Sequence, residues 1–195
     1  MRTVKFWIGL CVGAVAVPLA GLGVAAGGFI NMSASGPTGP LDRIGALMFE
    51  RNVRRLAPER KSPFGSDRQA LAAGFEHYKS SCVQCHGAPD IAGAEWAEGM
   101  QPVPPTLGAE STAEMSGGEL FHVIKHGVRM SGMPAFGGDH SDEDIWKIAA
   151  FVRTLDSLTD AQKDALRQQN GGEHSHGGHK ATTAAEEGDH GNDRH

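Results

Sequence analysis

The stretch Cys82-Val83-Gln84-Cys85-His86 decides the architecture of this 195-residue chain. Two thiols three positions apart, near the end of a helix, can both reach the vinyl groups of one haem and form thioether bonds. The adjacent His86 then presents its imidazole to the iron from one fixed side. Such a pentapeptide is typical of covalent c-type haem attachment. The sequence therefore predicts one covalent haem c, bound through Cys82 and Cys85, with His86 as an axial ligand.

Two other interpretations of the cysteine pair fit the surrounding sequence less well. A redox-active dithiol of the thioredoxin type follows a strand in a βαβ pattern, and no such pattern occurs here. A zinc site would combine the cysteines with His122 and His126. However, 36 residues separate Cys85 from His122, whereas zinc fingers have about 12–15. We therefore expect His122 and His126 on the exposed face of a helix.

Capping signals on both sides of the motif predict short helices. The expected helices run from Ser66 to Ser81, from Ser116 to Gly127, from Ser141 to Leu155, and from Thr159 to Gln168. No alternating pattern typical of a strand occurs, so the fold class is all-α. Between the first two helices, residues 87–115 contain four prolines and no helical period. Such a long irregular segment is unusual in a compact domain, unless a large apolar group fills the interior.

A second axial ligand has to approach the opposite face of the haem from a distant part of the chain. Met133 lies 47 positions after His86, in the loop Gly132–Phe136 between the second and third helices. A loop methionine held by the following proline is a reasonable thioether donor, so Met133 is the predicted ligand. Met130 is the alternative, and Met100 and Met115 are less well placed.

Residues 1–30 form an apolar segment. Phe6–Ile30 is 25 residues long without a charge. As a helix it would be roughly 37 Å long, enough to cross a hydrocarbon core of about 30 Å. We therefore expect a transmembrane anchor. A cleaved signal peptide is the alternative, because Val24–Ala26 offers small residues for a cleavage site. In both cases the rest of the chain is exported.

Residues 31–65 begin as a Ser/Gly/Pro-rich linker and carry 6 basic against 3 acidic side chains. Apolar residues recur there at helical spacing, namely Leu41, Ile44, Leu47 and Met48. One interpretation is an interfacial helix on anionic lipid, and the other is a solvated spacer.

Residues 169–195 carry no hydrophobic period, and we expect them to be disordered. Five of the chain's ten histidines lie in this tail: His174, His176, His179, His190 and His195. They could bind Cu(II), Ni(II) or Zn(II) as neutral imidazoles. A polar, solubilising terminus is the alternative.

Residues 66–168, the predicted haem domain, carry 8 basic against 15 acidic side chains. This balance favours a redox partner with a basic docking face. The net charge of −5 for the whole chain argues against a nucleic-acid binder that neutralises phosphates.

From about Asp67 to Leu155 the sequence resembles the class I monohaem cytochromes c, particularly the bacterial membrane-anchored type. Gly74 and Tyr78 look like the glycine and aromatic pair of the family's N-terminal helix. Ile148 and Phe151 look like their partners on the C-terminal helix. The resemblance implies that these two helices cross closely. It also implies a class I cytochrome c fold of three to four short helices around one covalent haem.

The same resemblance covers Pro105-Thr106-Leu107. It implies that the Pro105 carbonyl accepts a hydrogen bond from His86 and that Leu107 packs on the haem. The adjacent Pro104 is the alternative acceptor. Such a hydrogen bond sets the tautomer of the imidazole and makes it more electron-donating.

With histidine and methionine as ligands the iron has no open position, and a thioether ligand raises the potential. The expected function is one-electron transfer between redox partners, not catalysis, although the chain could be a subunit of a redox complex. We expect a single-pass protein of the bacterial cytoplasmic membrane with its haem domain in the periplasm. The alternatives are a five-coordinate haem enzyme or gas sensor, and a metal-handling protein that uses its tail.

Overall fold

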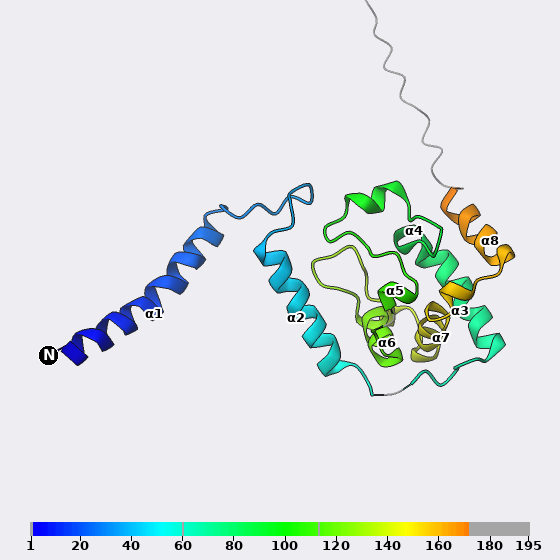
Figure 1. Cartoon of the computed structure of the whole chain (residues 1–195), viewed down its shortest axis with the longest axis horizontal. Helices are drawn as coiled ribbons and strands as arrows, with labels where there is room; N and C mark the ends of the chain where they lie inside the picture. The colour runs from blue at the N-terminus through cyan, green and yellow to red at the C-terminus, as the bar shows by residue number, and fades with distance from the viewer. Residues whose placement is uncertain (1, 60, 113, 172–195) are drawn as a thin grey trace, which may run out of the picture.

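The computed structural model describes residues 2–59, 61–112 and 114–171. Within these ranges all regular elements are helices, and the β-type pairing consists of the isolated bridge between Ala88 and Ile91. The predicted all-α class is therefore confirmed. Figure 1 shows a group of short helices and loops in residues 68–171, with α2 beside this group and α1 apart from it.

Helix α1 spans Arg2–Ala26 and contains Pro18. Its segment Thr3–Ala26 reaches a mean hydropathy of 2.2, and none of that window is buried against the rest of the chain. By length and composition α1 can cross a membrane, and a signal sequence would have the same properties. Helix α2, Pro40–Leu56, follows after a linker.

Within residues 61–112 and 114–171 the structure has four helices of at least ten residues and several shorter ones. The longer helices are α3 (Arg68–Ser81), α6 (Gly117–His126), α7 (Asp142–Val152) and α8 (Asp160–Gly171). The shorter elements are α4 (Val83–His86), η1 (Glu95–Gly99), α5 (Ala109–Thr112), η2 (Phe136–Gly138) and η3 (Leu155–Ser157).

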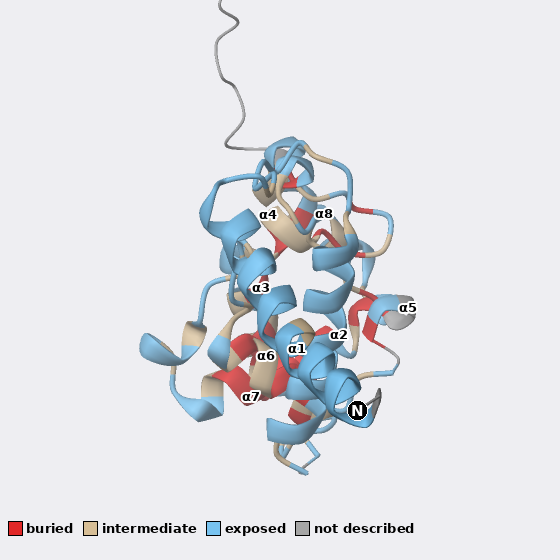
Figure 2. Cartoon of the chain, turned by 90° about the vertical axis from the view of Figure 1, so that its left-hand side faces the viewer, coloured by how far each residue is buried: buried red, intermediate tan, exposed pale blue. Residues whose placement is uncertain are grey.

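The core is centred on the crossing of α3 and α7. A Cβ atom at Gly74 would lie 2.8 Å from Cβ of Phe151 and would overlap the backbone of Lys147. The rings of Tyr78 and Phe151 lie 5.5 Å apart, centroid to centroid. Glycine at position 74 therefore permits the close approach of the two helices that the resemblance implied. Figure 2 shows buried residues gathered at α7.

Serine caps begin two of the helices as predicted. The hydroxyl of Ser116 accepts from the Glu119 amide at 3.2 Å, and the hydroxyl of Ser141 accepts from the Asp144 amide at 3.2 Å. Helix α6 ends before Gly127, which has the positive φ of 63° expected of a glycine terminator.

Other helix boundaries differ from the prediction. The N-cap of α3 is Asp67, not Ser66, since the Asp67 carboxylate accepts from the amides of Gln69 and Ala70 at 2.8 and 3.2 Å. Aspartate caps as well as serine does, and its charge also suits the positive end of the helix dipole. Helix α7 ends at Val152, three residues before the predicted Leu155, where the Thr154 hydroxyl donates to the Phe151 carbonyl at 2.7 Å.

Helix α8 continues three residues beyond the predicted Gln168, into the stretch assigned to the tail. The Asn170 side-chain amide donates to the Ala92 carbonyl at 2.8 Å, which ties the end of α8 to the loop after α4. The five tail histidines from His174 to His195 lie outside the described residues.

Candidate functional site

The cysteine motif lies at the joint between α3 and α4. Cys82 ends α3 and donates its backbone amide to the Tyr78 carbonyl at 2.9 Å. Val83, at the start of α4, is fully buried and fixes this short helix to the core. Cys85 and His86 form its last two residues. The two cysteines are half-buried and neither is in a disulfide, so both thiols are available for other bonds.

Burial controls the protonation of both thiols. Desolvation, with a smaller contribution from the neighbouring Cys85, raises the pKa of Cys82 to about 12. Burial also raises the pKa of Cys85. Both side chains therefore remain thiols at neutral pH, and a thiol has the sulfur and hydrogen that add across a vinyl double bond.

The imidazole of His86 is oriented by a hydrogen bond. Its Nδ1 lies 2.9 Å from the Pro105 carbonyl oxygen, and because a carbonyl only accepts, Nδ1 carries the proton. The other ring nitrogen, Nε2, then keeps its lone pair for a metal ion. Burial lowers the pKa of His86, with the Pro105 hydrogen bond acting in the opposite direction. The acceptor is Pro105 and not Pro104.

The segment after Pro105 is joined to the motif a second time. The Leu107 amide donates to the His86 carbonyl at 3.1 Å, and the half-buried Leu107 side chain packs against the core. These contacts place Pro105 and Leu107 beside His86, and the hydrogen bond between His86 and Pro105 is the one that the resemblance implied.

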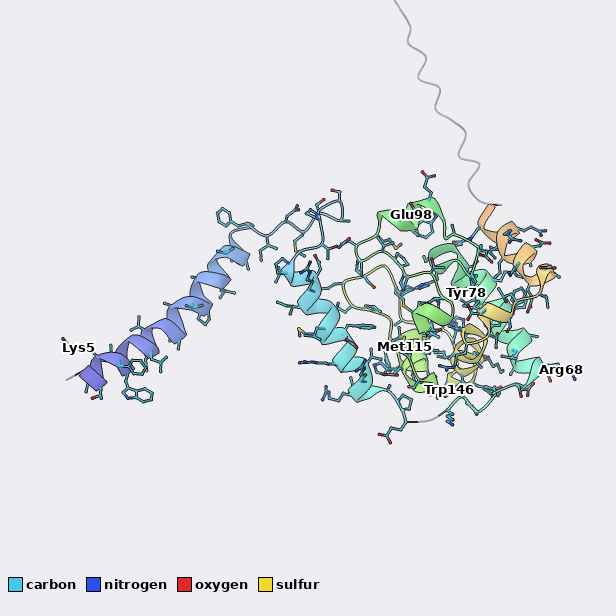
Figure 3. All side chains as sticks on the ribbon, in the orientation of Figure 1. Lys5, Arg68, Tyr78, Glu98, Met115 and Trp146 are labelled. Carbon is cyan, nitrogen blue, oxygen red and sulfur yellow. The ribbon has the colours of Figure 1, made fainter. Side chains whose placement is uncertain are left out.

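Tyr78 has a contact that the sequence pattern did not predict. Its hydroxyl donates to the carbonyl of Gly87, directly after His86, at 2.5 Å. Burial raises the pKa of Tyr78 far above its usual range, so the phenol keeps the proton that it donates. Gly87 has a φ of 57°, a backbone conformation that residues with a side chain rarely adopt. Tyr78 thus holds the chain where it turns away from the motif, and Figure 3 shows it among the central helices.

The methionine loop presents one of its two candidate sulfurs to the interior. Met133 is half-buried and packs against the core, whereas Met130 is 77% exposed. The loop is ordered by hydrogen bonds from the Val128 amide to the Met133 carbonyl at 3.2 Å and from the Met133 amide to the Ser131 hydroxyl at 3.1 Å. Met130 has a φ of 60°, in the left-handed region, where its side chain lies outside the core.

Met100 also lies at this loop, although its sequence position makes it a less well placed candidate ligand than Met133. A Cβ atom at Gly132 would lie 2.6 Å from Sδ of Met100. The absence of a side chain at Gly132 therefore makes room for the Met100 side chain at the methionine loop. No local pattern around Met100 signals this contact, because it joins two irregular segments.

The alternative zinc site receives no support from the structure. The rings of His122 and His126 lie 4.6 Å apart along α6, centroid to centroid. Among the residues that the structure describes, no group of three or more histidine, cysteine or acidic side chains is placed to hold a metal ion. His122 is half-buried and His126 exposed, so the prediction of an exposed helix face holds for His126 alone.

The donor set fits a covalently attached haem. Two thiols outside any disulfide, that of Cys82 directly before α4 and that of Cys85 within it, precede an imidazole whose Nδ1 proton is engaged by Pro105. The side chains of Leu107, Met115, Met133 and Phe136 are half-buried against one core cluster. Apolar, partly covered side chains of this kind suit a porphyrin, whose faces are apolar.

A match to a known protein family agrees with this chemistry. Residues 69–152, less than half of the chain, match the family described as cytochrome c oxidase, cbb3-type, subunit III. No curated protein matches the chain. One similar solved structure is cytochrome cL from the marine methylotrophic bacterium Methylophaga aminisulfidivorans. The two sequences are 24% identical, and the alignment covers 53% of this chain and 72% of the cytochrome cL chain, with a TM-score of 0.37.

Proposed function

Residues 69–152 form a class I cytochrome c domain, and we propose on this premise that the chain is a membrane-anchored, periplasm-facing electron carrier with one covalent haem c. A domain of this class works by haem-based electron transfer. Bound haem supplies reversible one-electron oxidation and reduction of its iron. The residues of the chain decide how that group is held and how stable each oxidation state is.

Each residue of the site has a distinct task in this proposal. Cys82 and Cys85 hold the porphyrin by thioether bonds, and His86 binds the iron through Nε2. Pro105 fixes the tautomer of His86 and increases the electron density at Nε2. Met133 is the second axial ligand, and Leu107 covers part of the porphyrin face.

The observation that carries electron transfer, rather than catalysis or gas sensing, is the inward position of Met133. Its loop is fixed by hydrogen bonds at both ends of the segment from Val128 to Met133. A sulfur ligand held in this way leaves the iron no open position for a substrate or a gas. It also keeps the same ligands in both oxidation states, so that little reorganisation accompanies electron transfer.

Methionine variants test this proposal. We expect Met133→Ala to lower the reduction potential and to make the ferrous protein bind carbon monoxide rapidly, because one axial position becomes open. Met130→Ala is the matched control in the same loop and is expected to retain the parent's potential and its resistance to carbon monoxide. If the parent protein already binds carbon monoxide rapidly, the five-coordinate alternative replaces the proposal.

The anchor and the redox partner belong to the same proposal. The apolar helix α1 supports retention in the membrane, and the excess of acidic over basic side chains in residues 66–168 supports a partner with a basic docking face. Membrane fractionation and N-terminal sequencing of the mature protein distinguish an anchor from a cleaved signal peptide. Electron-transfer rates with a basic partner should fall as salt concentration rises.

The name of the matching family favours a second possibility, that the chain is a subunit of a larger oxidase. Purification in mild detergent separates the two cases. A carrier elutes as this chain alone, whereas a subunit elutes together with other polypeptides and with additional haem.

A further inference from the structure

Helix α2 leaves most of its apolar side chains in solvent. Of its 17 residues, Val53 is the buried one. Four large apolar side chains near its start are exposed by about half or more: Leu41 by 58%, Ile44 by 53%, Leu47 by 46% and Met48 by 66%. This is a contiguous apolar surface next to a domain in which α3, α6 and α7 bury theirs, and such a surface indicates a partner.

The exposed side chains of α2 share one face with two arginines. Steps of three or four residues lead from Ile44 to Met48, Arg51 and Arg55, and residues at this spacing lie on one side of a helix. Val53 lies on the other side, where α2 contacts α6. The outer face is therefore apolar in its first half and cationic in its second half.

The positive charge of this face is not neutralised locally. Arg54 pairs with Glu50, and Asp42 accepts from the Gly39 amide at the N-terminus of α2. In the described part of the chain, Arg51 and Arg55 are exposed and form no ion pair. The two guanidinium groups are thus available to an anionic surface.

We propose that α2 lies on the surface of an anionic phospholipid bilayer, with Leu41, Ile44, Leu47 and Met48 inserted and with Arg51 and Arg55 on lipid phosphates. The pattern of an apolar side next to arginines matches the chemistry of such a surface. The proposal rests on the anchoring function proposed for α1.

The position of α2 in the chain favours lipid over a protein partner. α1 ends at Ala26 and α2 begins at Pro40, so the 13 residues 27–39 reach at most about 45 Å. An anchored α1 therefore keeps α2 close to the bilayer, and its apolar half is the end nearer to the anchor. A redox partner with a basic docking face would be repelled by Arg51 and Arg55.

Binding of α2 to lipid has a consequence for the haem domain. Because α2 contacts α6, it would turn the α6 side of the domain toward the membrane. The strongly acidic haem domain would otherwise be repelled by an anionic surface. Helix α2 thus places positive charge between the acidic haem domain and the anionic bilayer, and its contact with lipid sets the orientation of that domain.

Hydrogen exchange of the haem-loaded full chain in vesicles tests this proposal. One vesicle preparation contains phosphatidylglycerol and phosphatidylcholine, and the other contains phosphatidylcholine alone. We expect the amides of α2 to exchange at least about fivefold more slowly in the first preparation. The double variant Leu47→Glu/Met48→Glu should remove this difference, and Arg51→Gln/Arg55→Gln should reduce it. Val103→Glu, which alters a side chain 54% exposed outside α2, should retain it.

The same samples separate this proposal from that of the anchor. Protein that floats with the vesicles but shows equal exchange of α2 in both lipids overturns the lipid contact and leaves the anchor intact. Protection that fades as the chain is diluted into more lipid identifies a second copy as the partner and also overturns it. Protein that does not float with either vesicle overturns the anchor, and with it the proposal for α2.

Discussion

Helices α7 and α2 carry similar amphipathic patterns and have opposite surroundings. Seven of the eleven residues of α7 are buried, against α3 on one side and α6 on the other. Of the seventeen residues of α2, Val53 is buried and the face around Ile44 and Met48 is exposed. An apolar stripe therefore predicts that a helix will be covered, but it does not tell whether protein or lipid covers it. The difference depends on how closely a neighbouring helix approaches. At Gly74 the backbone of α7 lies against α3, whereas no neighbouring element lies within 4 Å of a Cβ atom at Gly45 of α2.

The largest expected effect on stability comes from a substitution at the contact between α3 and α7. Gly74→Ala places a Cβ atom against the backbone of Lys147 and 2.8 Å from Cβ of Phe151, so α3 and α7 have to separate. We expect a loss of about 3 kcal/mol or more in the free energy of unfolding, at the upper end of overpacking effects.

Gly45→Ala is the matched control on α2, since a Cβ atom there meets nothing within 4 Å. It should stabilise α2 by up to about 1 kcal/mol through helix propensity. Urea unfolding of the two haem-loaded variants provides the measurement. Equal free energies of unfolding for Gly74→Ala and Gly45→Ala would mean that α3 and α7 do not approach each other as closely as described.

A smaller loss is expected for Tyr78→Phe, which keeps the ring against Phe151 but removes the hydroxyl. The Gly87 carbonyl then loses its donor in a buried position, which costs about 1–3 kcal/mol. Because Gly87 follows His86 directly, we also expect faster hydrogen exchange in α4. Unchanged stability and unchanged exchange would show that the hydroxyl has no role in holding the motif.

Ser141→Ala tests the cap of α7 and should cost about 1 kcal/mol. The Ser141 hydroxyl is also the main cause of the lowered pKa of Asp144, with Lys147 contributing. A lowered pKa in the folded state stabilises the protein above the ordinary value of 3.8, and this contribution is lost as the pH falls below it. The stability difference between parent and variant should therefore narrow in acid, and a constant difference from pH 7 to pH 3 would contradict this.

The smallest effect is predicted for the exposed face of α2. Met48→Ser should change the free energy of unfolding of the detergent-solubilised protein by less than about 0.5 kcal/mol, because Met48 is 66% exposed. Ile148→Ala on α7 should cost about 2–5 kcal/mol, since Ile148 is buried. A comparable loss from Met48→Ser would show that protein, rather than solvent or lipid, covers this face of α2.

Local signals in the sequence predicted the residues that would hold the haem and most helix boundaries. Cys82, Cys85 and His86 are adjacent, and the caps at Ser116 and Ser141 each depend on four consecutive residues. The choice of Asp67 over Ser66 as the cap of α3 could not be made, because both residues cap well and they are neighbours.

Contacts between distant segments could not be predicted from local patterns. Met100 lies beside Gly132 across two irregular stretches, and the hydrogen bond of Asn170 joins the end of α8 to the irregular loop at Ala92; no periodicity signals either contact. The preference for Met133 over Met130 came from the proline that follows Met133, and the structure adds that Met130 is exposed with a positive φ. The resemblance to a known family, not the residues alone, indicated Pro105 as the partner of His86.

Intact-mass spectrometry tests the central claim most directly. Protein produced in a host that matures c-type cytochromes is denatured, extracted with acidic acetone and weighed. The account predicts a mass of the polypeptide plus one haem, and loss of that added mass in the double variant Cys82→Ser/Cys85→Ser. A bare polypeptide mass for the parent protein would contradict it.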